Sequence, residues 1–133
     1  MDIEPYIVPE FAAQGASIQT QYLDGLSKMI QRRNASGLYL PFGPAIPKWF
    51  DSQTFNLTWN GSTKVLSQHV QDISDYIAIM DYRDTADGPA GIIQGAKDEI
   101  DYANAIGKKE LRYHRRGNVR HCGRRGSCND HLP

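Results

Sequence analysis

The stretch DYIAIMDYRD, residues 75–84, holds the strongest strand signal of the chain and decides which fold class the sequence predicts. Its apolar run, YIAIM, is nearly continuous, which is typical of a strand that is buried on both faces. Strands of this kind belong to parallel sheets, in which helices connect one strand to the next. The stretch therefore predicts one strand of a parallel α/β sheet.

Helical patterns lie on both sides of this strand. The first is predicted over residues 16–35, ending near Gly37, which suits a C-terminal cap. A shorter helix is predicted over residues 63–73, with Ser62 as its N-cap. A third is predicted over residues 91–107, with Gly107 as its cap. Its predicted inward positions are Ile92, Ile93, Ala96, Ile100 and Ala103.

Two further strands are predicted before the central one. MDIE at residues 1–4 reads as the end of a strand, and LYLPFGPAIP at residues 38–47 reads as a strand followed by a loop, KWFDS. The alternation of strand and helix predicts parallel strands with right-handed crossovers, as in a doubly wound sheet or a barrel. No G-x-G-x-x-G follows a strand, which disfavours nucleotide binding.

Polar and aromatic residues gather at the carboxyl end of each predicted strand. Asp2 and Glu4 alternate with Ile3, so both carboxylates share one face of an extended chain. Trp49 follows the second strand, and Tyr82 follows the third. Because functional groups in parallel α/β folds collect at the carboxyl ends of strands, these residues are predicted to form one site.

These strand endings resemble those of the chitinase-like (β/α)8 glycoside hydrolases. In that family an Asp-x-Glu ends the fourth strand and a Met-x-Tyr ends the sixth; the matches here are Asp2-Ile3-Glu4 and Met80-Asp81-Tyr82. DIEPY, GPAIPKWF and DYIAIMDYRDT resemble a group of hydrolase-like barrel proteins related to them. The resemblance covers residues 1–109 and implies a partial (β/α)8 barrel of about three parallel strands, corresponding to strands four to six.

The resemblance implies a role for each matching residue. Glu4 would be the general acid that protonates the leaving glycosidic oxygen, and Asp2 would favour its protonated form and orient the acetamido group of the substrate. Tyr82 would hold the reacting sugar, and Trp49 would stack on a sugar ring. The implied substrate-binding set is completed by Met80 and Asp84. No cofactor and no metal are implied.

Each of these residues also has a structural interpretation. Asp2 and Glu4 fit a frayed, solvated N-terminus, while Met80, Tyr82 and Trp49 fit core packing. Asp81, Arg83 and Asp84 suit a surface ion pair. His69 lies among apolar helix positions and suits a structural role.

The charge distribution separates the chain into two parts. Residues 1–109 contain 9 basic and 13 acidic residues, a net charge of −4, and residues 110–133 contain 6 arginines and 2 acids, a net charge of +4. The formal net charge is zero, so the overall charge does not favour binding to nucleic acid or to a membrane. The acidic start does not resemble a signal peptide. Three glycosylation sequons, at Asn34, Asn56 and Asn60, favour a secreted parent.

Residues 110–133 show no periodicity and are predicted to be a disordered basic tail. Their composition is typical of a gene read out of frame, and a one-base shift with suitable silent bases yields a sequence typical of further strands. A metal site is a second interpretation, from His114, His121, Cys122, Cys128 and His131, but the spacing is not a standard zinc pattern. A disulfide between Cys122 and Cys128 would suit a secreted chain, and a basic arm that binds a polyanion would also fit this composition.

Three functional hypotheses follow. A (β/α)8 barrel has about 250 residues, so this chain of 133 residues is expected to be a truncated, hydrolase-like barrel protein that is inactive alone. Its open strand edges are expected to favour self-association, which gives the second hypothesis, a glycosidase active as an oligomer. The third is a non-enzymatic interaction protein that uses Trp49, Tyr82 and the basic tail.

Overall fold

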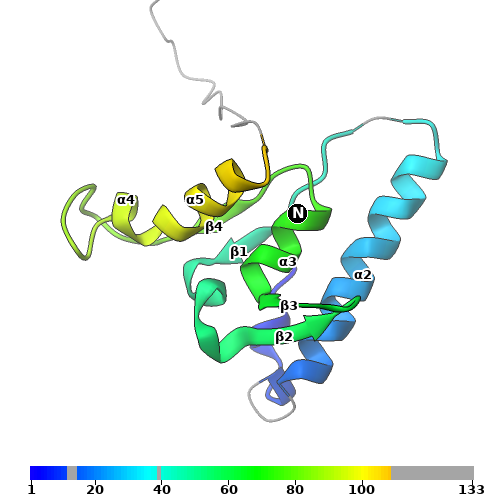
Figure 1. Ribbon diagram of the computed structural model, residues 1–133, viewed down its shortest axis with the longest axis horizontal. Helices are drawn as coiled ribbons and strands as arrows, with labels where there is room; N and C mark the ends of the chain where they lie inside the picture. Colours follow the sequence, from blue (N-terminus) through cyan, green and yellow to red (C-terminus); the bar gives the residue numbers. More distant parts are fainter. Residues whose placement is uncertain (12–14, 39, 109–133) are drawn as a thin grey trace, which may run out of the picture.

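The computed structural model describes residues 1–11, 15–38 and 40–108, and these form a mixed α/β structure with a small parallel sheet (Figure 1). The helices are η1 (Pro5–Ile7), α2 (Ala16–Ala35), η2 (Lys48–Asp51), η3 (Gln53–Phe55), α3 (Leu66–Ile73), α4 (Ile92–Gly95) and α5 (Lys97–Ala105), where η marks 3-10 helices. The strands are β1 (Ala45–Pro47), β2 (Asn56–Trp59), β3 (Ser62–Val65) and β4 (Ala78–Met80). The predictions for the tail, from residue 109 onward, lie outside the described residues.

The parallel pairing predicted from the strand–helix alternation is confirmed. β1 pairs with β4 in parallel, with Ile46 opposite Ile79 and Pro47 opposite Met80. The opening segment joins the other edge of β1 through one parallel bridge, from Asp2 to Ala45. The opening segment, β1 and β4 therefore lie side by side in that order.

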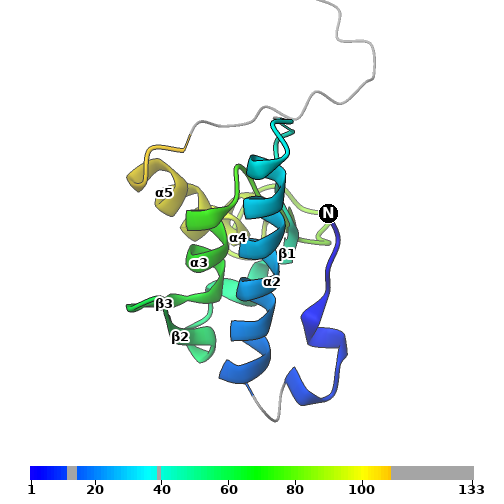
Figure 2. The same cartoon turned by 90° about the vertical axis from the view of Figure 1, so that its right-hand side faces the viewer.

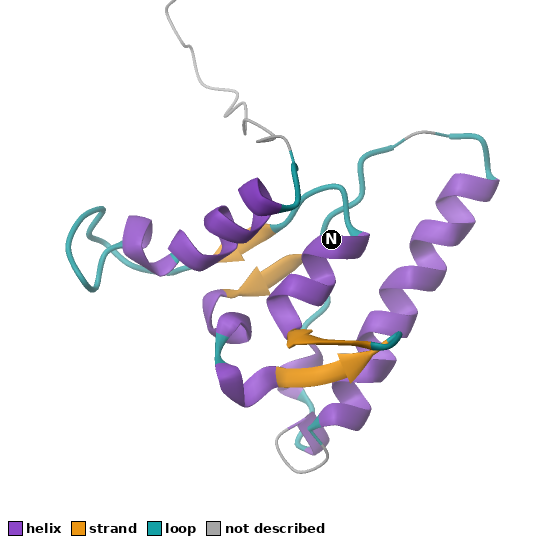
Figure 3. Ribbon diagram, viewed as in Figure 1, coloured by secondary structure: helices purple, strands orange, loops and turns teal. Residues whose placement is uncertain are grey.

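The strands are much shorter than predicted. The ten-residue strands expected over residues 38–47 and 75–84 shrink to β1 and β4, and residues 1–4 contribute a single bridge (Figure 3). Three prolines in the first of these stretches lack the backbone N–H that a ladder requires, which limits regular pairing. The expectation that residues 75–84 are buried on both faces is also wrong, since Ala78 is exposed and Ile79 and Met80 are half-buried.

Helix α2 forms where the sequence predicts it. Tyr22, Leu23 and Leu26 are buried on one face, at the spacing of three and four residues that a helix requires. Gly37, with φ of 70°, follows the helix in the left-handed conformation that favours glycine and suits a C-terminal cap.

The β2–β3 hairpin corrects the predicted start of the second helix. Residues 63–65 are strand rather than helix, Ser62 opens β3, and the N-cap of α3 is Val65. Asn60 and Gly61 have φ of 49° and 77°, the pair of positive values that a type I′ hairpin turn requires. In β2, Leu57 and Trp59 are buried, and Asn56 and Thr58 are exposed. An Asn-Gly pair next to such an alternation indicates a hairpin, but the helical spacing of the following residues led to the prediction of a helix.

The third predicted helix is split and rotated. α4 and α5 are separated by Ala96, and Ile92, Ile93 and Ile100 are exposed by 39, 61 and 46 % rather than packed inward. Glu99 occupies the buried face in their place, with 2 % exposure. Of the predicted inward positions, Ala96 and Ala103 are half-buried, so the helical period was right and the inward face is rotated away from the three isoleucines. Gly107 follows it at φ of 70°, as predicted for a cap.

The hydrophobic core lies between α2, α3, the hairpin and the aromatic residues around η2. Phe50 is fully buried, and five aromatic rings have centroids 5.0 to 6.3 Å from its own. Those rings belong to Tyr6, Phe11, Tyr22, Trp49 and Phe55. Seen from the side, α2 lies in front of β1, and α3 lies between α2 and α5 (Figure 2). No helix in the described part of the chain is long and apolar enough to cross a bilayer.

Candidate functional site: an acidic and aromatic strand edge

The carboxyl ends of the parallel segments meet at one edge of the sheet. Asp2 bridges to β1, and Pro47 of β1 lies opposite Met80 of β4, so the residues that follow each segment emerge on the same side. These are the residues that the sequence predicts as a site. We call Asp2, Glu4, Tyr6, Trp49 and Tyr82 the acidic–aromatic edge.

Tyr6 lies at the centre of this edge. Its ring packs edge-on against Trp49, with centroids 5.1 Å apart. Burial raises the pKa of Tyr6 to about 12, and a hydrogen bond to Glu4 and the charges of Glu4, Asp2 and Tyr82 add to the effect. The charges of both acids and of Tyr82 therefore reach Tyr6, and the phenol keeps its proton at neutral pH.

The edge offers two aromatic faces to solvent. Trp49 is anchored by Tyr6 and Phe50, yet 37 % of its surface remains exposed. Tyr82 is 92 % exposed, so core packing does not account for it. Trp49 thus serves both interpretations of the sequence, as a packing anchor and as an accessible platform.

The start of the chain is paired with its neighbour in the sheet. The Ala45 N–H donates to the carbonyl oxygen of Met1 at 2.7 Å, and the Met1 ammonium group donates to the carbonyl oxygen of Gly43 at 3.0 Å. The interpretation of residues 1–4 as a frayed terminus is therefore wrong for the backbone, although the Asp2 side chain is exposed. Backbone pairing holds Asp2 beside β1.

Met80 and Asp84, the other predicted substrate-binding residues, lie beside rather than within the edge. Met80 ends β4 and is half-buried, and Asp84 is exposed. The contacts that define the edge come from the remaining predicted residues, and from Tyr6. Tyr6 could not be found from the sequence, because it lies in η1, where the two-residue alternation of Asp2 and Glu4 ends, and its contact with Trp49 joins distant parts of the chain.

The predicted ion pair between Asp81 and Arg83 forms, but Asp81 is not at the surface. Its carboxylate pairs with Nε of Arg83 at 3.1 Å, but the Asp81 side chain is only 4 % exposed, and its Oδ2 atom has no hydrogen-bond partner among the described residues. The Oδ2 atom lies against Gly95 of α4, where a methyl group would come within 2.2 Å of it. Asp81 therefore acts as a buried contact between β4 and α4.

His69 has the structural role that its apolar surroundings predict. It is 2 % exposed, its Nε2 atom lies 3.0 Å from the Leu57 carbonyl oxygen, and its ring packs edge-on against Trp59. Trp59 in turn donates to Asp24 at 2.9 Å. These contacts join the hairpin to α3 and α2, so His69 is a structural residue and not part of the candidate site.

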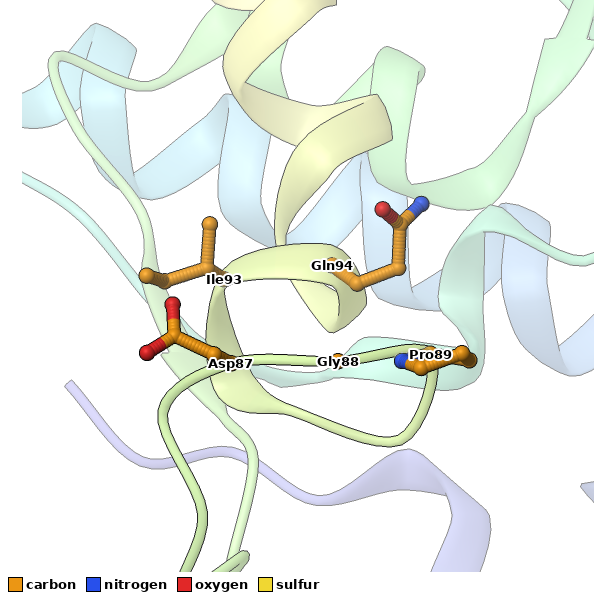
Figure 4. Close-up of a pocket in the computed structure, with 5 residues that line it drawn as sticks. All are labelled: Asp87, Gly88, Pro89, Ile93 and Gln94. Atoms are coloured by element: carbon orange, nitrogen blue, oxygen red, sulfur yellow. The ribbon is translucent and has the colours of Figure 1, made fainter.

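A hollow of about 610 Å³ lies between α4 and the loop that precedes it (Figure 4). It is lined by Asp87, Gly88 and Pro89 of the loop before α4, and by Ile93 and Gln94 of α4. None of the predicted site residues lines it. Its single carboxylate and single amide offer little chemistry, so the acidic–aromatic edge remains the candidate site.

No group of three or more His, Cys, Asp or Glu side chains is placed to hold a metal ion within residues 1–11, 15–38 and 40–108. Comparisons with models of protein families, with curated proteins and with solved structures found no match to the chain.

Proposed function

We propose that this chain is part of a glycoside-hydrolase-like barrel and that its acidic–aromatic edge binds carbohydrate, with Glu4 as the general acid of the complete site. The observation that carries the proposal is the parallel order of the opening segment, β1 and β4, with Glu4, Trp49 and Tyr82 at their common edge. An acid that faces exposed aromatic rings suits a sugar, whose C–H faces stack on rings while its hydroxyls bond to carboxylates.

The chemistry of each residue supports its proposed role. The Glu4 carboxyl would protonate a leaving glycosidic oxygen, and Asp2 would orient the acetamido group of the substrate. Tyr6, with its hydrogen bond to Glu4 and a pKa of about 12, would orient that carboxyl without competing for its proton. Tyr82 and Trp49 would hold the sugar ring.

The isolated chain is proposed to bind sugar without hydrolysing it. A barrel site takes residues from several strand ends, whereas the described residues present β1, β4 and the bridged opening segment. We therefore expect weak, millimolar-range binding of oligosaccharides, because few contacts bury little of the ligand.

The test of the proposal is titration of the chain with chitin and cellulose oligosaccharides, followed by NMR. We expect shifts at Tyr82 and Trp49 that the variant Tyr82→Ala weakens severalfold, whereas Leu40→Ala does not, since Leu40 is 66 % exposed and precedes β1. Binding that is identical in Tyr82→Ala and Leu40→Ala, or no binding to either sugar series, would contradict the proposal.

A second candidate is a glycosidase that is active as an oligomer. It is favoured by β4, whose outer edge has no strand partner among the described residues, since unpaired edges promote association. Hydrolysis that appears only in fractions of dimer mass or larger, and is lost in Glu4→Gln, would support this candidate. The interaction-protein hypothesis depends on the basic tail, which lies outside the described residues.

A further inference from the structure

Helices α4 and α5 are attached to the rest of the molecule in an unusual way. The hydrophobic core and the apolar side chains packed on it extend from Ile3 to Ile77, and neither helix adds a member. The large apolar side chains of the two helices and of the residue after them are instead exposed, by 38 to 61 %. These side chains are Ile92, Ile93, Ile100 and Ile106.

Polar groups make the attachment instead. The Tyr102 hydroxyl donates to Asp72 at 2.7 Å, and it accepts from Lys64 at 2.8 Å. Beyond the end of α5, the Lys108 ammonium group donates to the carbonyl oxygens of Gln71 and Ser74. Segments held by few apolar contacts open locally at a lower free energy than the core does.

Glu99 sits in the middle of this interface. It is 2 % exposed, and neither of its carboxylate oxygens has a hydrogen-bond partner among the described residues. An ionised carboxylate in such a place costs several kcal/mol, in order of magnitude, unless a cation compensates it. The charges that act on its pKa are the negative charges of Asp51 of η2 and Asp98 of α5. Lys48, the other charged residue of η2, lies with the stem of its side chain near Gly95 of α4.

The other titratable groups on α3, which packs against α5, are engaged elsewhere. Asp72 is paired with Lys64, and His69 lies at the Leu57 carbonyl oxygen. Burial raises the pKa of Glu99 to about 7. The charges of Asp51 and Asp98 add to this effect, and the residue's own backbone N–H opposes it. Glu99 therefore changes its charge close to neutral pH.

We propose that α4 and α5 form a detachable segment, and that protonation of Glu99 controls whether the segment is docked on α3 and η2. With Glu99 protonated, the carboxyl is neutral and the segment stays docked. With Glu99 ionised, the carboxylate gains hydration by leaving the interface, and the two helices separate from the core. Detachment would move α4 and α5 away from η2, which carries Trp49 of the acidic–aromatic edge.

The sign of the pH effect follows from the direction of the shift. A group whose pKa is higher in the docked state stabilises docking below the pKa of the free group, and this stabilisation is lost as the pH rises through the raised pKa. For Glu99 the loss lies between about pH 4.5 and about pH 7, the ordinary and the raised value.

Hydrogen exchange of the full chain tests the proposal, with rates corrected for the intrinsic effect of pH. We expect protection of residues 97–105 to fall at least about tenfold between about pH 5 and about pH 8. Protection of α2 should stay constant. Glu99→Gln should abolish the fall, and Asp101→Asn, an equivalent change at an exposed position of the same helix, should preserve it.

Three results would overturn the proposal: constant protection of α5, an equal fall in Glu99→Gln, or a parallel fall in α2, which would mean global unfolding. Should Glu99→Gln not fold, Asp51→Asn provides the second test. Removing this negative neighbour lowers the pKa of Glu99, so the midpoint of the fall should move to lower pH. An unchanged midpoint would contradict the proposal.

Discussion

At the scale of single residues, Asp75 and Glu99 differ in whether hydrogen-bond donors and a cation meet the carboxylate. Asp75 is met by two donors, the Phe42 N–H at 2.7 Å and the Arg33 guanidinium group. Burial would raise the pKa of Asp75, but the hydrogen bonds and the Arg33 charge outweigh burial and lower it. Glu99 has no such donors among the described residues, and its pKa is raised to about 7.

Asp75→Asn should destabilise the protein by about 1–3 kcal/mol at neutral pH, because it removes the charge-assisted bonds that join α2 to the start of β1 and β4. A lowered pKa gives stability above the ordinary pKa that is lost as the pH falls through the folded value. The difference between wild type and variant should therefore shrink toward about pH 3 in urea unfolding. A constant difference across pH, or an equal loss in the exposed-residue control Asp87→Asn, would contradict this role.

At the scale of elements, close contact rather than propensity sets the position of α4. Gly95 lies against Asp81, which follows β4 and is itself buried and paired with Arg83. Gly25 of α2 offers the matched comparison, since a methyl group there would have no neighbour within 4 Å. The two helical glycines should thus respond in opposite ways to the same substitution.

Gly25→Ala should stabilise the protein by about 0.5–1 kcal/mol, the usual gain of alanine over glycine within a helix. Gly95→Ala should destabilise it by about 1–3 kcal/mol, because the new methyl group meets the Asp81 carboxylate. In thermal unfolding, the double variant Gly95→Ala with Asp81→Ala should recover much of this loss. Simple additivity of the two changes would argue against the contact.

At the scale of the whole molecule, stability is concentrated in one half. The aromatic residues around Phe50 join η1, α2 and η2, and the hairpin closes the core through Leu57 and Trp59. The segment after β4 adds polar contacts and exposed isoleucines instead. The molecule thus has a packed body and a weakly attached pair of helices.

Phe50→Ala should cost about 3–5 kcal/mol in urea unfolding, because it leaves a cavity at the centre of the aromatic residues. Ile100→Ala should change stability by less than about 0.5 kcal/mol, since Ile100 is 46 % exposed. If Phe50→Ala does not fold, Phe50→Leu should still cost more than Ile100→Ala. Equal effects at the two positions would mean that α5 belongs to the core.

The sequence by itself determined the local and periodic features of this protein. It predicted the bounds of α2, the parallel relation of the segments ending at Pro47 and Met80, and the glycine caps at Gly37 and Gly107. Each depends on spacing or backbone conformation that neighbouring residues dictate. Its Asn60-Gly61 turn was also readable, but the apolar spacing of the following residues suggested a helix in its place.

Only the tertiary structure decided which face of a helix is inward and which side chains meet. The burial of Glu99 in place of Ile100, the shortening of the strands and the placement of Tyr6 between Glu4 and Trp49 depend on contacts between distant segments. Periodicity gives the width of an apolar face but not its partner. The partner is set by packing, which balances the whole set of contacts at once.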